Sequence, residues 1–145
     1  MKRTAMPIRF ALTDANIQNC FPIMAQLRPH LVEGEFVARV RQQEQDGYRL
    51  VLLEESGDVR AVSGFRTGES LSWGGFLYID DSVTGESSRS HGFGQQLFDW
   101  IVDFAKANGC VQLHLDSGVQ RFGAHRFYLT NRMDIAAHHF SLALG

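Results

Sequence analysis

The pattern of apolar and polar residues changes period several times along the chain. A short alternating run over residues 8–12 predicts a first strand. Apolar residues then recur at helical spacing from about 13 to 28, and Pro29 ends that pattern. A second amphipathic stretch, from about 33 to 46, predicts another helix. The chain therefore opens with one strand and two helices.

Three runs rich in apolar residues follow, and they cover residues 48–53, 59–65 and 76–81. The first of them is almost continuously apolar, which is typical of a strand buried on both faces. The connections between them are too short for crossovers, so we expect an antiparallel meander.

The last third of the sequence returns to helical spacing before it alternates again. A long amphipathic helix is predicted after Gly94, ending at Asn108-Gly109, and a strand over 111–116. This strand–helix–strand order implies a right-handed crossover, so the fourth and fifth strands should run parallel. A short helix over 120–129 and a loosely alternating last strand over 133–144 complete the pattern. The fold class is α/β, with three layers around a mixed, mostly antiparallel sheet.

The turn before the long helix has the sequence Arg89-Ser90-His91-Gly92-Phe93-Gly94. Its two glycines allow a tight turn and close approach of a ligand, because neither has a Cβ. The helix that follows presents unpaired N–H groups and the positive end of its dipole, which suits a phosphate or pyrophosphate. Arg89 adds a permanent cation. An ordinary strand–helix connection explains the same glycines, and a Gly-x-Gly by itself favours that interpretation.

Composition and charge narrow the class of protein. A chain of 145 residues with a net charge of −2 fits one domain, residues 1–145, and predicts no nucleic-acid or membrane partner. Basic residues near Met1 precede no apolar segment, so no signal peptide is predicted. Cys20 and Cys110 lack metal-ligand spacing and are expected to be free thiols in a reducing cytoplasm.

The order of elements and the glycine turn together resemble the GNAT superfamily of acyl-CoA-dependent N-acetyltransferases, over nearly the whole chain. The segment 89–94 matches the family's Arg/Gln-x-x-Gly-x-Gly/Ala loop, and Ala124-His125-Arg126-Phe127-Tyr128 resembles its Ala-x-x-Phe/Leu-Tyr segment. Three positions depart from the family pattern. One loop residue before Arg89 is extra, Arg121 stands where asparagine is common, and Arg132-Met133 replaces Gly-Phe.

The resemblance implies that acetyl-CoA is the cofactor, used as a co-substrate, and that an amine is the acceptor. Its diphosphate would lie on backbone N–H groups of the loop, and its pantetheine arm beside the end of the fourth strand. The residues that would bind it are Ser82, Val83, Arg89, Ser90, His91, Gly92, Phe93 and Gly94.

Attack of an amine on a thioester needs a group that takes the amine proton and benefits from an acid at the leaving thiolate. The family position makes Tyr128 the candidate acid, although a half-buried structural tyrosine is the alternative. For the base, Asp81 (or its neighbour Asp80) ends a strand, and His114 shares a strand face with Asp116, which would raise its basicity. Strand-end aspartates also cap turns, and strand histidines are more often structural.

No metal site is predicted, because the adjacent His138 and His139 would point to opposite faces of a strand. In the family, acceptor specificity comes largely from the first two helices and their connection, here residues 28–36. Glu33 and Glu35 either attract a cationic amine or simply stabilise the start of a helix.

Two functions remain open. The first is a cytoplasmic N-acetyltransferase that acetylates a primary amine of a small molecule or protein. The second is a non-catalytic acyl-CoA-binding or regulatory module of the same fold. The retained Tyr128 and the strand-end carboxylates favour the enzyme. The apolar last segment also allows a homodimer in which it pairs or exchanges between two copies.

Overall fold

A computed structural model describes residues 7–145, and these fall into two compact units. The first ends at His114, and the second runs from Leu115 to Gly145. The residues before Pro7, for which no signal peptide is predicted, lie outside the described residues.

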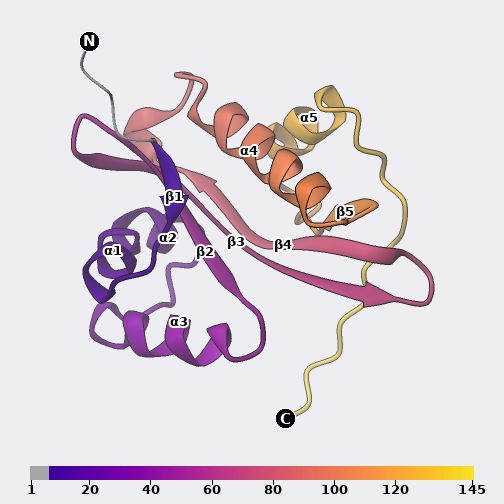
Figure 1. The fold of residues 1–145 in the computed structure, drawn as a ribbon, viewed down its shortest axis with the longest axis horizontal. Helices are drawn as coiled ribbons and strands as arrows, with labels where there is room; N and C mark the ends of the chain where they lie inside the picture. Colours follow the sequence, from indigo (N-terminus) through magenta and orange to yellow (C-terminus); the bar gives the residue numbers. More distant parts are fainter. Residues whose placement is uncertain (1–6) are drawn as a thin grey trace. The chain divides into compact units, whose positions relative to one another are not determined.

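The first unit is organised around a sheet whose strands follow one another in sequence order (Figure 1). β1 pairs antiparallel with β2, β2 with β3 and β3 with β4, while β4 and β5 run parallel. The predicted meander and the predicted parallel pair are both confirmed. The strands are β1 (Ile8–Phe10), β2 (Arg49–Glu55), β3 (Asp58–Ser70), β4 (Gly74–Thr84) and β5 (Gln112–Leu115).

At one position of the pairing between β3 and β4, a glycine leaves room for the side chain of Tyr48. Gly64 pairs with Asp81, and the ladder is irregular directly after Gly64. A Cβ at Gly64 would overlap the ring of Tyr48, which is buried next to it. The absence of a side chain at Gly64 therefore lets Tyr48 lie across β3 and reach the carboxylate of Asp81.

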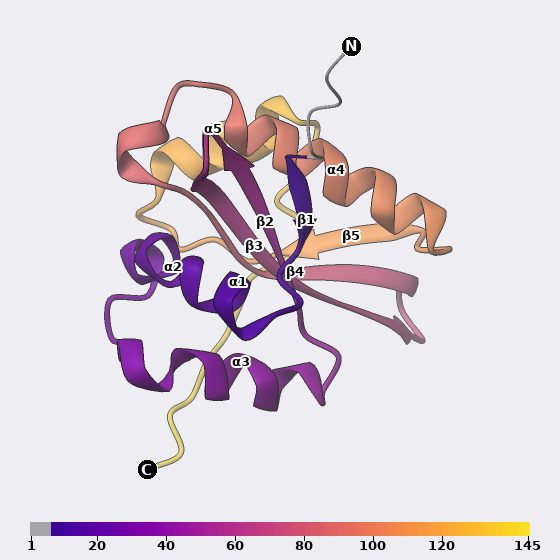
Figure 2. The same cartoon turned by 60° about the vertical axis from the view of Figure 1, so that its left-hand side comes forward.

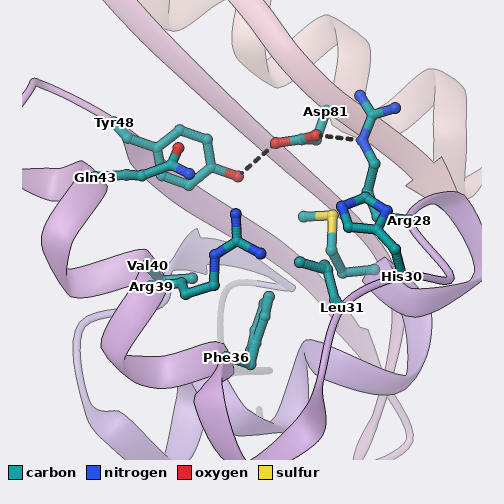
Figure 3. A pocket seen from close by; sticks show the side chains of 10 residues that line it. Arg28, His30, Leu31, Phe36, Arg39, Val40, Gln43, Tyr48 and Asp81 are labelled. Atoms are coloured by element: carbon teal, nitrogen blue, oxygen red, sulfur yellow. Dashed lines mark hydrogen bonds and ion pairs between the residues drawn. The ribbon is translucent and has the colours of Figure 1, made fainter. Parts of the chain in front are cut away.

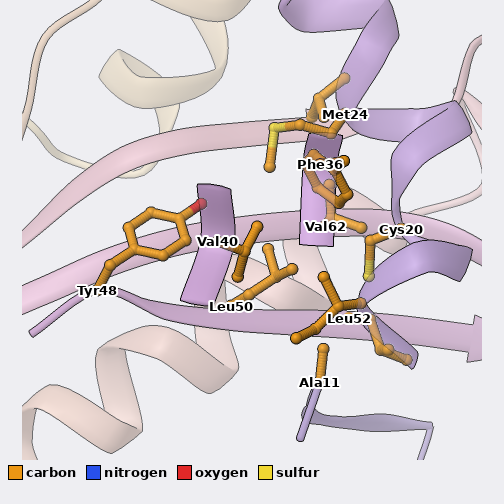
Figure 4. Packing of buried hydrophobic residues seen from close by; sticks show 11 residues of the cluster. Ala11, Cys20, Met24, Phe36, Val40, Tyr48, Leu50, Leu52 and Val62 are labelled. Atoms are coloured by element: carbon orange, nitrogen blue, oxygen red, sulfur yellow. The ribbon is translucent and has the colours of Figure 1, made fainter. Parts of the chain in front are cut away.

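Three helices cover one face of the sheet: α1 (Asp14–Asn19), α2 (Phe21–Leu27) and α3 (Phe36–Glu44), with a 3₁₀ turn, η1 (Glu33–Glu35), before α3. The prediction of a single helix over 13–28 is wrong, because α1 ends before Cys20 and α2 begins directly after it. Pro22 stands in the first turn of α2, where its missing N–H costs nothing. Ile17, Met24 and Phe36 pack with strand residues such as Leu52 in one core (Figure 4).

α4 (Phe93–Ala107) lies against the other face of the sheet (Figure 2). Its Phe104 ring is 5.3 Å from Phe65 of β3 and 5.5 Å from Phe10 of β1, measured between ring centroids. Leu97 and Ile101 are buried along the same helical stripe, and each such side chain contributes roughly 1.5–3 kcal/mol. The first unit thus has helices on both faces of its sheet, as predicted.

The second unit contains α5 (Phe122–Thr130) and an extended stretch without regular structure. The last strand predicted over 133–144 is wrong: these residues form no strand, and Ile135, Phe140, Leu142 and Leu144 are exposed. Loose alternation does not make a strand unless a neighbour pairs its backbone groups. In the described part of the chain this segment has no such neighbour.

Candidate active site

The glycine loop joins β4 to α4 through a strained turn. Ser90 and Gly92 both have positive φ angles, 70° and 81°, and Gly92 directly precedes the first residue of α4. A Cβ on Gly92 would meet no atom within 4 Å, so the surface of this turn is open. A ligand can therefore approach the backbone closely here.

The same turn leaves several backbone donors unused. Among residues 7–145, none of the N–H groups of His91, Gly92, Phe93 and Gly94 has a hydrogen-bond acceptor. They stand at the positive end of a helix of 15 residues, and Arg89 is exposed beside them without an ion-pair partner in the described chain. These residues fit the diphosphate of a coenzyme, because unpaired N–H groups and a helix N-terminus attract anions.

The segment before the loop, where one extra residue is predicted, has fixed contacts. The N–H of Gly85 donates to the Arg60 carbonyl at 2.7 Å, and the N–H of Glu86 donates to the Gln26 side chain at 2.7 Å. η2 (Glu86–Ser88) follows, with Ser88 buried. The glycine loop comes after this turn, directly before α4.

Ser82 and Val83 lie near the carboxyl end of β4. Val111 donates to the Gly75 carbonyl at 2.8 Å, which sets β5 beside the beginning of β4. Because β4 has 11 residues and β5 has 4, β5 does not extend along the segment that holds Ser82 and Val83. Their other edge pairs with Ser63 and Val62 of β3. Among the described residues, no further strand pairs with this edge of β4 at Ser82 and Val83.

Asp81 precedes these residues on β4, and two side chains from the helical layer hold its carboxylate (Figure 3). Oδ1 accepts from Nε of Arg28 at 3.0 Å, and Oδ2 accepts from the Tyr48 hydroxyl at 2.9 Å. Burial, with the negative charge of Asp81 as a further cause, raises the pKa of Tyr48 well above its usual value. Tyr48 therefore stays protonated and donates to Asp81 at neutral pH.

Asp80 has a different partner. Its carboxylate accepts from Nε of Arg66 at 2.7 Å, and its carbonyl accepts from Nη2 of Arg28 at 3.0 Å. Arg66 also donates to Gln43 of α3, which ties α3 to this part of the sheet. Asp81, and not Asp80, lines the neighbouring cavity.

That cavity has a volume of about 300 Å³ (Figure 3). We propose below that it takes the acceptor, and we call it the acceptor pocket. Apolar side chains from α2, α3 and their connection form part of its wall, and polar ones converge on it. Glu33 and Glu35 are exposed and do not line it. The lining residues are Met24, Arg28, His30, Leu31, Phe36, Arg39, Val40, Gln43, Tyr48 and Asp81.

His114 lies elsewhere on the sheet. Its ring stacks on Trp73, with centroids 3.5 Å apart, and its Nε2 is 2.7 Å from Oε1 of Gln112. Trp73 directly precedes β4, whereas Asp81 stands near the carboxyl end of that strand, so His114 and Asp81 are not brought together. Burial lowers the pKa of His114, which keeps the imidazole neutral at pH 7.

The remaining predicted residues belong to the second unit. Tyr128 is half-buried on α5 with its ring 5.5 Å from Phe127, and burial raises its pKa above 10.0 despite the opposing charge of Arg121. The carboxylate of Asp116 is 3.2 Å from Nδ1 of His139. Its predicted pairing with His114 stays a prediction.

Sequence reasoning missed two polar residues of the acceptor pocket, Arg39 and Tyr48, whereas Arg28 belongs to the predicted range 28–36. Gly64 makes room for the Tyr48 ring, but in the sequence it looks like an ordinary strand glycine. Its role becomes visible only when Tyr48 is placed beside it. Among the described residues, no three His, Cys, Asp or Glu side chains gather in a way that suits a metal ion.

The family model described as "Acetyltransferase (GNAT) family" matches residues 16–132, and the chain belongs to this family. An uncharacterized N-acetyltransferase of Bacillus subtilis (strain 168), YhdJ, is 37% identical over 114 residues, which are 78% of this chain and 80% of that protein.

Solved structures show the same fold at low identity. A transcriptional regulator from Bacillus halodurans C-125 superimposes with a TM-score of 0.83 and 20% identity, covering 94% of this chain and 98% of the other. A ribosomal-protein-alanine N-acetyltransferase from Brucella melitensis biovar Abortus 2308 gives 0.81 and 13%, covering 94% and 99%. In the described part of the present chain, every helix is too short or too polar to cross a bilayer.

Proposed function

We propose that this protein is an N-acetyltransferase that moves an acetyl group from acetyl-CoA to a primary amine by direct attack on the thioester. The observation that carries the proposal is the set of four unused backbone N–H groups at the start of α4, beside Gly92. The acceptor pocket is reached along the same strand, since Asp81 is directly followed by Ser82 and Val83. Donor and acceptor sites therefore share the carboxyl end of β4.

Binding of the donor is assigned to the loop and to the strand edge. The N–H groups of His91, Gly92, Phe93 and Gly94 would hold the diphosphate, with Ser90 shaping the turn and Arg89 supplying positive charge. The pantetheine arm would lie along the open edge at Ser82 and Val83, and its carbonyl and N–H groups would pair with those of the strand.

The reaction forms a bond between the amine nitrogen and the acetyl carbon and breaks the bond between that carbon and sulfur. The amine proton must leave, and Asp81 is our first candidate to receive it, directly or through a water molecule. Each of its oxygens accepts one hydrogen bond, so lone pairs remain that can receive a proton. His114 is the second candidate, as a neutral imidazole.

Tyr128 is the candidate acid that protonates the departing thiolate. Its raised pKa means that the phenol keeps its proton throughout the neutral range, as an acid must before it acts. The single-domain organisation over residues 1–145, the cytoplasmic location and the homodimer remain predictions as well.

The test is turnover with detection of the free thiol of CoA, measured over a panel of primary amines. We expect amine-dependent thiol release and a product heavier by one acetyl group in mass spectrometry. Reactions without amine measure background hydrolysis. Calorimetric binding of acetyl-CoA with no turnover on any amine would instead support the non-catalytic acyl-CoA-binding module.

A further inference from the structure

We propose that the acceptor carries an anionic group, a carboxylate or a phosphate, close to its amine, and that Arg39 binds this anion. The inference rests on the proposed function, because it names the substrate class of the same site. Two arginines, Arg28 and Arg39, and one acidic residue, Asp81, line the acceptor pocket.

Arg39 is a cation without a counterion. It projects from α3 into the pocket, on the side where Tyr48 and Asp81 meet (Figure 3). Within residues 7–145 it has neither a hydrogen bond nor an ion pair. Arg41, two residues further along the same helix, binds both Asp14 and Glu44.

Arg28 and His30 add donors to the same pocket (Figure 3). Arg28 uses Nε on Asp81 and Nη2 on the Asp80 carbonyl, and this leaves donors of its guanidinium available. His30 lines the pocket and has no hydrogen-bond partner among the described residues. A planar anion at this place can bind two guanidinium groups, and bidentate contacts of this kind are strong.

Asp81 supplies the opposite charge. It is 17% exposed, so its carboxylate faces the cavity and attracts a protonated amine before the proton is removed. An acceptor with an ammonium near Asp81 and an anion near Arg39 matches both charges of the pocket. A polyamine does not, since its second ammonium would meet Arg39.

The rest of the wall limits the remaining part of the acceptor. Met24, Leu31, Phe36 and Val40 present apolar surface, and the volume of about 300 Å³ suits a molecule of amino-acid size. An apolar α-amino acid has all three features, and an aminoalkyl phosphate has the two charged ones.

The experiment compares acceptors that differ only in the anion. Leucine, methionine and phenylalanine are each compared with their carboxamides, and 2-aminoethyl phosphate is compared with ethanolamine. We expect kcat/KM to be roughly 10–100-fold higher for the anionic member, as for the loss of a hydrogen-bonded charge. The amino acids and the phosphate are separate arms, so the preferred arm identifies which anion is recognised.

Variants assign the preference to Arg39. In Arg39→Gln, the preference for the anionic acceptor should fall to near one. Arg39→Lys should restore part of the preference because it restores the charge without the planar fork. Arg41→Gln removes the same charge from the same helix outside the pocket and should leave the preference intact.

Binding without turnover separates this inference from the proposed function. Ligand-observed NMR with leucine and 2-aminoethyl phosphate, in the presence of CoA, should show binding that Arg39→Gln abolishes. That result without thiol release from any amine would sink the proposed function and keep the anion site. Turnover that is equal for both members of every pair would overturn the inference and keep the enzyme.

Discussion

The glycine loop and the acceptor pocket lie at the same end of β4, but they are built differently. The loop is six consecutive residues, and the groups that we propose for binding are backbone N–H donors at the start of α4. The pocket gathers residues from Met24 to Asp81, and six of the ten have polar side chains. A site made of backbone groups depends on conformation, so glycine is the residue type that it requires. A site made of side chains can change its selectivity by single substitutions.

The two regions also differ in how their charges are balanced. The loop offers N–H groups and Arg89 with no acid in contact, which suits a ligand of high negative charge. The pocket holds an acid that is already paired, Asp81 with Arg28, next to the unpaired Arg39. We infer that the loop binds the acyl donor, which is the same throughout the family, and that the pocket selects the acceptor, which differs between proteins.

The largest effect is expected from Tyr128→Phe, which tests whether chemistry needs a group outside both regions. The substitution removes one hydroxyl and keeps the ring packing. If Tyr128 protonates the thiolate, kcat and kcat/KM should fall together by roughly 10²–10⁴-fold. Affinity for acetyl-CoA should hardly change, since the loop supplies most of it.

Steady-state kinetics with an accepted amine, and a check that chemistry limits the rate, measure this effect. Because burial raises the pKa of Tyr128, loss of the acid through ionisation should appear only above pH 10.0. Near-normal turnover of the phenylalanine variant would assign the tyrosine a packing role and leave the proton to solvent.

The next effect should come from Gly92→Val, which breaks the loop and leaves the pocket alone. A β-branched residue at a φ of 81° is strained, and its side chain would block approach of the diphosphate. Strain of this kind lowers stability by about 1–3 kcal/mol. The blocked approach removes charge-assisted hydrogen bonds to the diphosphate, so acetyl-CoA affinity by calorimetry should fall roughly 10–100-fold.

Gly57→Val is the matched control for this variant. Gly57 has a φ of 82° and equally open surroundings, but it lies in the turn between β2 and β3. It should lower stability and leave acetyl-CoA affinity unchanged. Unaltered affinity in Gly92→Val would remove the diphosphate from this loop.

A smaller effect is expected from Tyr48→Phe, which weakens the pocket and spares the loop. Asp81 would lose one of its two hydrogen bonds, and the unfolding free energy should fall by about 1 kcal/mol. Denaturant titration of this variant, of Asp81→Asn and of the double variant gives the coupling between the two groups. Additive changes would mean that the hydrogen bond does not hold Asp81 in place.

The smallest effect concerns His114. Burial lowers its pKa, so the unfolded chain binds its proton more readily than the folded chain near pH 6.5. Its contribution to stability should therefore decrease as the pH falls below 6.5, and His114→Gln should flatten this dependence. An imidazole NMR titration midpoint above 6.5 would contradict the expectation and favour a carboxylate partner such as Asp116.

Periodicity and turn chemistry were sufficient for most elements of the first unit. The short connections predicted that β2, β3 and β4 run antiparallel, and the long helix before β5 predicted that β5 runs parallel to β4. Periodicity failed at Cys20, because the same spacing fits one helix or two that meet at a bend. It failed again over 133–144, where a strand pattern has no pairing partner among the described residues.

The sequence by itself determined the glycine loop, because its binding groups and its two glycines are consecutive and their conformation is a local matter. It determined the family for the same reason. Only the tertiary structure decided the acceptor pocket, because Arg28, Tyr48 and Asp81 are far apart in the chain and meet where Gly64 makes room for a ring. The unpaired charge of Arg39 is likewise a property of its neighbours, and no spacing in the sequence indicates which neighbours those are.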